Sequence, residues 1–127
     1  MDLFIVAIPV AVVIALVLLK QLTQLSAAAA AEHLRQGARI VDVRSPAEFQ
    51  ERHLPNAINI PLGDLKDLAP EKLPDKERVL LLHCLSGGRS AMGMRVLKGM
   101  GYRHVFNLGS YSRASRIVDS VQPCERT

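Results

Sequence analysis

The sequence predicts an α/β domain with a central, mainly parallel sheet flanked by helices, and three observations support this fold class. Short apolar segments typical of buried strands occur at 39–43, 57–60, 78–83 and 104–108. Segments of helical composition lie between them, and no internal repeat interrupts the order. Strands that alternate with helices of about ten residues form parallel sheets covered on both faces.

Each helix is predicted from the residues at its ends. Ser26 is a suitable N-cap for a helix that stops at Gly37, and Ser45 with Pro46 opens a short helix that Pro55 ends. The leucines of 62–77 have the spacing of one short amphipathic turn. The last two helices are expected after strands 78–83 and 104–108, at 88–101 and 112–121.

The first residues differ from the rest of the chain. Residues 3–19, LFIVAIPVAVVIALVLL, contain neither a charge nor a side-chain hydrogen-bonding group. A helix of this length spans roughly 25 Å, slightly less than a hydrocarbon core of about 30 Å, and the stem of Lys20 extends its reach. We expect residues 1–21 to form a transmembrane anchor, residues 20–25 to include a short linker, and residues 22–127 to form one domain.

A cleaved signal peptide is the alternative, with SAAAAA at 26–31 as the cleavage region. The segment before the apolar run carries Asp2 and no Lys or Arg, which favours a retained single-pass anchor. The basic residues Lys20, Arg35 and Arg39 follow the run, so the positive-inside rule predicts that the C-terminal domain lies in the cytoplasm. Cleavage stays an open alternative.

Composition argues against several classes of function. The net charge of +4 is modest and the basic residues are scattered among few aromatics, so no nucleic-acid partner is expected. Two cysteines do not make a disulfide framework, and the histidines, cysteines and acids lack the spacing of metal ligands. Cys124 lies in a polar tail, QPCERT, as an incidental thiol or, alternatively, a resolving cysteine. We expect no metal and no cofactor.

The segment HCLSGGRS at 83–90 carries the predicted chemistry. Cys84 follows the most strand-like segment directly, and ligands bind beyond the carboxyl ends of parallel strands. Gly87 and Gly88 allow successive backbone N–H groups to converge, while a helix N-terminus and Arg89 lower the pKa of a nearby thiol. Ser90 adds a hydroxyl donor. The arrangement suits attack by sulfur on an anionic substrate.

These residues resemble the rhodanese family of sulfurtransferases. The loop from Cys84 to Arg89 fits the family's Cys-x-x-Gly-x-Arg pattern. IVDVRSPAEFQERHLPNAINIPL at 40–62 and GYRHVFNLGS at 101–110 are similar to two further family segments, so the resemblance extends over about residues 22–120. It implies a rhodanese-like domain, here preceded by one transmembrane helix.

The resemblance also implies roles for single residues. Cys84 is the expected nucleophile, while Asp42, Arg44 and Glu48 are structural, with Arg44 and Glu48 pairing around the Ser45-Pro46 turn. Ser110 stands where the family has a glycine and the chain has no tryptophan, which leaves substrate choice open. The expected substrate-binding residues are Leu85, Ser86, Gly87, Gly88, Arg89 and Ser90.

The implied function is sulfur transfer through a Cys84 persulfide, from thiosulfate or another persulfide donor to a thiol or cyanide acceptor. The related phosphatases have a longer Cys-x5-Arg loop, and the short loop here favours sulfur over phosphate. His53 and His83 are not needed as bases if the loop ionises the thiol. The alternative is a non-catalytic, membrane-tethered persulfide carrier or partner-docking module, favoured by the altered rim after Gly109.

Overall fold

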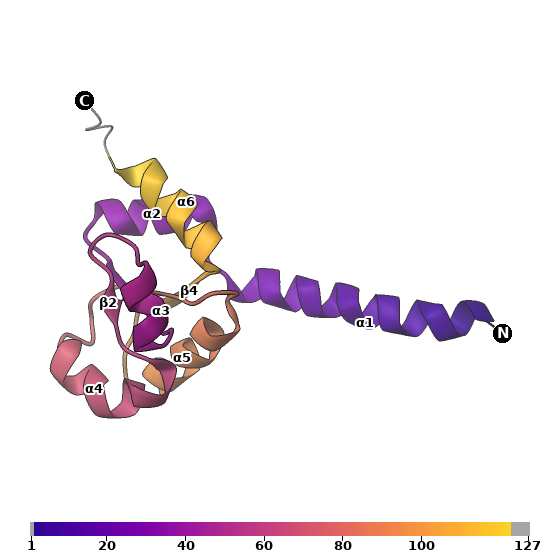
Figure 1. The fold of residues 1–127 in the computed structure, drawn as a ribbon, viewed down its shortest axis with the longest axis horizontal. Helices are drawn as coiled ribbons and strands as arrows, with labels where there is room; N and C mark the ends of the chain where they lie inside the picture. The colour runs from indigo at the N-terminus through magenta and orange to yellow at the C-terminus, as the bar shows by residue number, and fades with distance from the viewer. Residues whose placement is uncertain (1, 123–127) are drawn as a thin grey trace.

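The computed structural model describes residues 2–122, except for the side chains of residues 2, 3, 20, 21 and 23. The chain alternates between helices and strands after one long N-terminal helix (Figure 1). In order, the elements are α1 (Asp2–Thr23), α2 (Ala27–Arg35), β1 (Arg39–Asp42), α3 (Pro46–Glu51), β2 (Ile58–Asn59), the 3₁₀ helix η1 (Leu62–Asp64), α4 (Leu65–Lys72), β3 (Leu80–His83), α5 (Gly88–Gly99), β4 (Val105–Gly109) and α6 (Tyr111–Val121).

The four strands form one parallel sheet in the order β2-β1-β3-β4, which confirms the predicted fold class. Asp42, the last residue of β1, is in register with His83, the last residue of β3. Because parallel strands end at the same edge of a sheet, this register places the chain after Asp42 beside the chain after His83. The two segments that carry the predicted site residues are therefore neighbours.

Helices cover both faces of the sheet. One apolar cluster packs α4 and α5 against Leu80 and Leu82 of β3, and the other packs α2 and α6 against Leu81. Side chains alternate between the faces of a strand, so Cys84 joins the α5 cluster whereas His83 lies toward Tyr111 of α6. Neighbouring residues at the end of β3 thus have different surroundings.

Serine residues begin three of the helices. The side chain of Ser26 accepts a hydrogen bond from the Ala29 N–H, as predicted, and Ser110 caps α6 in the same way. Ser45 and Glu48 form a capping box at the start of α3. This helix ends at Glu51, before the predicted stop at Pro55, because Arg52 is already extended.

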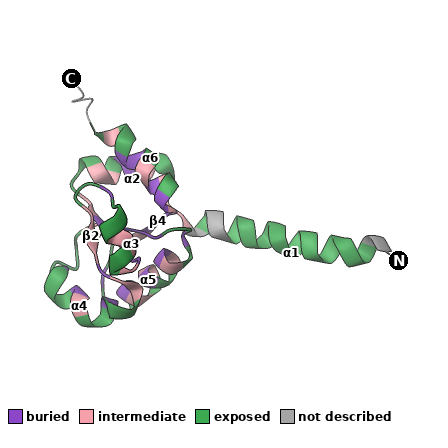
Figure 2. Cartoon of the chain, viewed as in Figure 1, coloured by how far each residue is buried: buried purple, intermediate pink, exposed green. Residues whose placement is uncertain are grey.

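The N-terminal helix α1 projects away from the domain (Figure 1), and the described side chains along it are exposed (Figure 2). Helical structure continues to Thr23, so most of the predicted linker is part of α1. Among the residues that the structure describes, no helix is both long and apolar enough to cross a membrane. The helix is confirmed, and the transmembrane anchor over residues 1–21 is not.

The chain between α1 and α2 is attached to the sheet. Gln24 forms a parallel bridge with Asn107 of β4, and the Leu25 N–H donates to the Asn107 carbonyl at 2.9 Å. The Arg113 guanidinium donates to the Leu25 carbonyl and, at 2.6 Å, to the Leu108 carbonyl. Residues 24 and 25 therefore occupy the outer edge of β4.

Candidate active site

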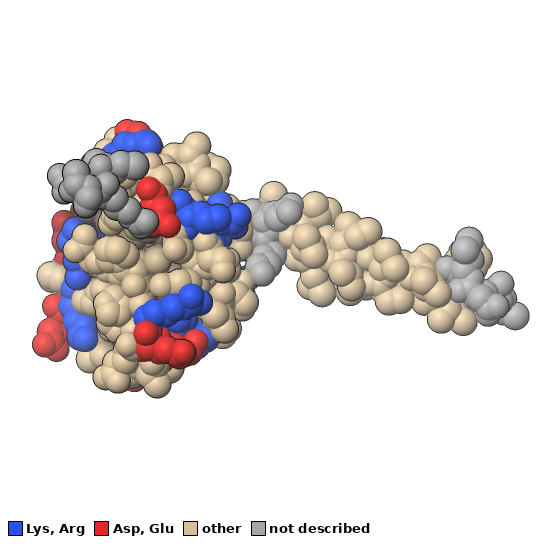
Figure 3. Space-filling model, turned by 45° about the horizontal axis from the view of Figure 1, so that its top comes forward, with Lys and Arg blue, Asp and Glu red and all other residues tan. Residues whose placement is uncertain are grey.

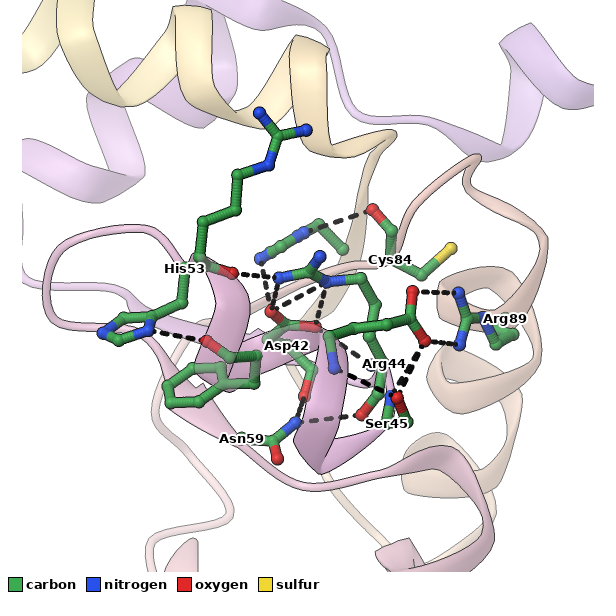
Figure 4. A network of polar contacts seen from close by, with 11 residues as sticks. Asp42, Arg44, Ser45, His53, Asn59, Cys84 and Arg89 are labelled. Atoms are coloured by element: carbon green, nitrogen blue, oxygen red, sulfur yellow. Dashed lines mark hydrogen bonds and ion pairs between the residues drawn. The ribbon is translucent and has the colours of Figure 1, made fainter.

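Cys84 is the first residue after β3 and is completely buried. Its N–H donates to the Gly109 carbonyl at 3.2 Å, which fixes its backbone against the end of β4. Its sulfur points away from Asp42 and Arg44 (Figure 4). The parallel sheet thus brings the predicted nucleophile to the edge where ligands of such folds bind.

The loop after Cys84 surrounds its sulfur with donors. Gly87 adopts φ +99°, and its N–H donates to Sγ at 2.9 Å. The Ser90 hydroxyl lies 3.6 Å from Sγ. Leu85, Ser86 and Gly88 are exposed, and the Leu85 carbonyl accepts a bond from the Tyr111 N–H at 3.2 Å. The structure therefore brings Gly87 and Ser90 to the sulfur as the sequence predicts.

Two opposing effects act on the Cys84 thiol. Burial raises the pKa, because a charged sulfur loses its hydration. Hydrogen bonds from the Ser90 hydroxyl and from the N–H groups of Ser90, Gly87 and Ser86 favour the thiolate, and together they bring the pKa of Cys84 below its usual 9.0. The loop therefore makes a buried cysteine more acidic, and the thiolate is the nucleophilic form.

Arg89 belongs to an ion pair. Its two terminal nitrogens contact the two carboxylate oxygens of Glu48, Nη1 to Oε1 at 2.8 Å and Nη2 to Oε2 at 3.0 Å. The Arg89 guanidinium lowers the pKa of Glu48 to about 2, so the carboxylate is charged at neutral pH. The charge of Arg89 is thus largely compensated at rest.

The predicted pairing of Arg44 with Glu48 is wrong. Arg44 instead binds Asp42 with its Nε and Nη2 atoms, at 3.0 and 2.7 Å, and its own N–H donates to Asp42 Oδ1 at 2.9 Å. The turn after β1 folds Arg44 back onto Asp42, whereas the capping box directs Glu48 toward α5 (Figure 4). Both Asp42 and Arg44 are buried, as expected for structural residues.

The histidines have surroundings that do not suit a base. His83 is completely buried, and its Nε2 atom has no hydrogen-bond partner and lies 3.7 Å from Asp42 Oδ2. Burial lowers the pKa of His83, so the ring is neutral at physiological pH. His53 stacks on Phe49 and contacts its carbonyl at 2.8 Å. Within residues 2–122, no group of acids, histidines and cysteines is arranged to hold a metal ion.

Asn107 belongs to the surroundings of Cys84, although no sequence motif indicates it. It lies in β4, is 1% exposed, and its Oδ1 atom accepts bonds from the Ser90 hydroxyl at 2.7 Å and the Gly109 N–H at 3.0 Å. Asparagine is uncommon in buried strands, and this was the available signal in VFNLG. Cys124, by contrast, lies outside the described residues, so its predicted roles stay untested.

Comparisons with known proteins agree with this geometry. The family model of the Rhodanese-like domain matches residues 26–115. The thiosulfate sulfurtransferase PspE of Escherichia coli is 39% identical over 69 residues, which cover 54% of this chain and 66% of that protein. The putative sulfur carrier protein YrkF of Bacillus subtilis is 34% identical over 73 residues, which cover 58% of this chain and 38% of that protein. The matched part therefore spans less than two thirds of either relative.

Solved structures give the same result. An Escherichia coli rhodanese with anions superposes with a TM-score of 0.58 and 35% identity, over 61% of this chain and 91% of that one. The human single-domain sulfurtransferase TSTD1 superposes with a TM-score of 0.63 and 26% identity, over 74% of this chain and 96% of that one.

Proposed function

The chain belongs to the family of rhodanese-like domains, and on this premise we propose that it is a sulfurtransferase in which Cys84 carries the transferred sulfur. One observation carries this assignment: the only cysteine in residues 2–122 lies under the N–H of Gly87, with its sulfur 2.9 Å from that donor. A thiolate held in this way is an acidic, oriented nucleophile.

In the first step, the Cys84 thiolate attacks the outer sulfur of thiosulfate. A Cys84–sulfur bond forms, the sulfur–sulfur bond of the donor breaks, and sulfite leaves with its electron pair. The product is a persulfide on Cys84. Since Cys84 is fully buried at rest, we expect residues of the loop to move aside before the donor reaches Sγ.

In the second step, cyanide or a thiolate attacks the outer sulfur of the persulfide. The product is thiocyanate or a new persulfide, and the Cys84 thiolate leaves with its electron pair. Preorganised N–H groups stabilise the negative sulfur in both steps, and removal of one such donor costs about a hundredfold or more in comparable sites. Arg89 contributes to the binding of thiosulfate only when its ion pair with Glu48 opens.

The test measures thiocyanate formed from thiosulfate and cyanide. The wild-type chain is expected to turn over, whereas Cys84→Ser is expected to form no thiocyanate. A Cys124→Ser variant provides the matched control, because it removes the other thiol of the chain and leaves Cys84 in place. Full activity of Cys84→Ser would contradict the mechanism.

A persulfide carrier without turnover is the second candidate, and the complete burial of Cys84 favours it. A relative described as a putative sulfur carrier protein is also similar to this chain. Mass spectrometry after thiosulfate treatment separates the two functions. A stable gain of one sulfur atom on Cys84 without thiocyanate formation would favour the carrier, and no adduct would favour a docking module.

A further part of this function is its location, which we place at a membrane through α1. The large apolar side chains between Phe4 and Leu19 are 50–76% exposed, and none contacts the domain core (Figure 2). Charged side chains gather on the domain, whereas the described part of α1 has none (Figure 3). Such a surface is more stable against lipid than against water.

Flotation with phospholipid vesicles tests this location. The full chain is expected to float with the vesicles, and a Val13→Glu variant, which places a charge in the exposed apolar surface, is expected to float less. A thiol reagent that does not cross membranes then tests the orientation in intact cells. Labelling only after permeabilisation would support a cytoplasmic Cys84, and labelling of intact cells would contradict it.

A further inference from the structure

Asn107 contacts the surroundings of Cys84 with both ends of its amide. Its Oδ1 atom accepts from the Ser90 hydroxyl at 2.7 Å, and its Nδ2 atom donates to the Gly87 carbonyl at 3.3 Å. Ser90 and Gly87 are also the two residues whose donors lie nearest to Sγ. The buried Asn107 side chain of β4 therefore fixes both residues that donate to Sγ, Gly87 and Ser90.

The Ser90 hydroxyl has one hydrogen and three acceptors within reach. These are Asn107 Oδ1 at 2.7 Å, the Gly87 carbonyl at 3.1 Å and Cys84 Sγ at 3.6 Å. A neutral thiol is a weak acceptor, so the hydrogen lies on Asn107 while Cys84 is protonated. A thiolate is a charged acceptor and forms a stronger hydrogen bond, so the hydroxyl turns to Sγ when the thiol ionises.

This rotation leaves no buried group without a partner. When the hydroxyl turns away, Asn107 Oδ1 still accepts the Gly109 N–H at 3.0 Å. An acceptor that lost its only partner in the interior would cost about 1–3 kcal/mol. The second bond to Asn107 therefore makes the hydroxyl available to a charged sulfur at low cost.

We propose that Asn107 is a positioning residue for the nucleophile, because its amide holds the Ser90 hydroxyl beside Cys84 Sγ and keeps the hydroxyl hydrogen on Oδ1 until the sulfur carries negative charge. This role rests on the proposed use of Cys84 as the nucleophile. It assigns to β4 a part in the chemistry that the loop sequence alone does not suggest. Asn107 itself does not contact the sulfur.

The other ionisable groups near Cys84 lie apart from the Asn107 amide. His83 precedes it on β3 but lies on the opposite face of the sheet with Asp42 and Arg44. On α5, Arg89 is paired with Glu48 of α3. None of these groups contacts the Asn107 amide, so a substitution at Asn107 changes the sulfur environment without breaking an ion pair.

The test is a titration of the Cys84 thiolate by its ultraviolet absorbance, with Cys84→Ser as the blank that subtracts Cys124 and the tyrosines. Asn107→Leu replaces the amide with an apolar group of similar size and frees both donors. We expect it to lower the pKa of Cys84 by up to about one pH unit, because the Ser90 hydrogen then has no amide acceptor that competes with Sγ. Ser90→Ala is expected to raise the pKa, because it removes the donor itself.

The double variant distinguishes positioning from general damage. If Asn107 acts through Ser90, Asn107→Leu will change the pKa less in the Ser90→Ala background than in the wild type. Asn59→Leu is the matched control, because the Asn59 amide also makes two bonds to backbone carbonyls, at 3.0 Å each, away from the sulfur. It is expected to lose stability and keep the thiol pKa.

An unchanged or raised pKa in folded Asn107→Leu would overturn the assignment, as would additive effects in the double variant. If Asn107→Leu does not fold, Asn107→Ser takes its place, since its shorter side chain does not reach Ser90 and Gly87 together. The titration contains no sulfur donor. A failure of the proposed sulfur transfer would therefore appear in the thiocyanate assay and not here.

Discussion

Glu48 binds Arg89 with both carboxylate oxygens across 41 residues of sequence, at 2.8 and 3.0 Å. The contact joins α3 to the first turn of α5, and hence the loop after β1 to the loop after β3. Glu48 also accepts from the Ser45 N–H at 3.2 Å. A single carboxylate thus caps one helix and compensates the arginine of the Cys84 loop.

This pair predicts a dependence of stability on pH. Arg89 lowers the pKa of Glu48 from 4.5 to about 2. A carboxyl group whose pKa is lower in the folded state stabilises the fold above its unfolded pKa, and the contribution is lost as the pH falls through the folded value. Wild type should unfold at a higher urea concentration than Glu48→Gln near neutral pH, and the difference should shrink between pH 4.5 and about 2. A constant difference would contradict the pairing.

Loss of Asp42 is expected to destabilise the fold strongly. Three bonds from Arg44 side-chain nitrogens end on Asp42, and both residues are buried. Asp42→Ala leaves the guanidinium without its partner, which costs about 3–5 kcal/mol of the free energy of unfolding. Glu32→Ala breaks the exposed pair with Arg35 and should cost less than about 1 kcal/mol. Urea denaturation of both variants measures the contrast, and equal losses would refute it.

Gly87 is expected to matter for activity as well as for stability. An alanine at φ +99° is strained by about 1–2 kcal/mol, and its Cβ atom would lie 3.2 Å from Gln24 Nε2. Relief of this strain turns the N–H away from Sγ, so Gly87→Ala should lower thiocyanate formation on the order of tenfold to a hundredfold.

Gly37→Ala is the matched control for Gly87→Ala. Gly37 has nearly the same φ, +96°, and nothing within 4 Å of its Cβ position. It should lose stability through backbone strain alone and keep its rate of thiocyanate formation. Equal loss of activity in the two variants would assign the effect to instability instead of to the sulfur contact.

His83 is expected to affect acid stability and not catalysis. Its pKa is lowered by burial, so the folded state resists protonation that the unfolded state accepts below about pH 6.5. Wild type should therefore lose stability relative to His83→Leu as the pH falls from about 7.5 to about 5, because the variant lacks this cost. Thiocyanate formation should stay within a few-fold. A loss of activity on the scale of Cys84→Ser would make His83 part of the mechanism.

Local signals predicted the fold and the position of Cys84 at a strand end, while long-range contacts decided the rest. The apolar strands, the serine caps and the Cys84 loop are each visible within a few residues of sequence. Glu48 pairs with Arg89 rather than with nearby Arg44, because the capping box and the parallel register together choose the partner. Asn107 lies 17 residues from Ser90, and only the packing of β4 against α5 brings the two together.

Because Gln24 pairs with Asn107, no flexible linker separates α1 from the sheet. A flexible spacer would let a domain sweep a volume that grows with the length of the spacer, whereas here the helix runs to Thr23 and the next residue is already paired with β4. The Gln24 amide also lies beside Gly87 and Gly109. Any surface that binds α1 therefore also fixes the height and the orientation of the Cys84 loop. Under the proposed function, a sulfur acceptor then has to approach the loop at that position.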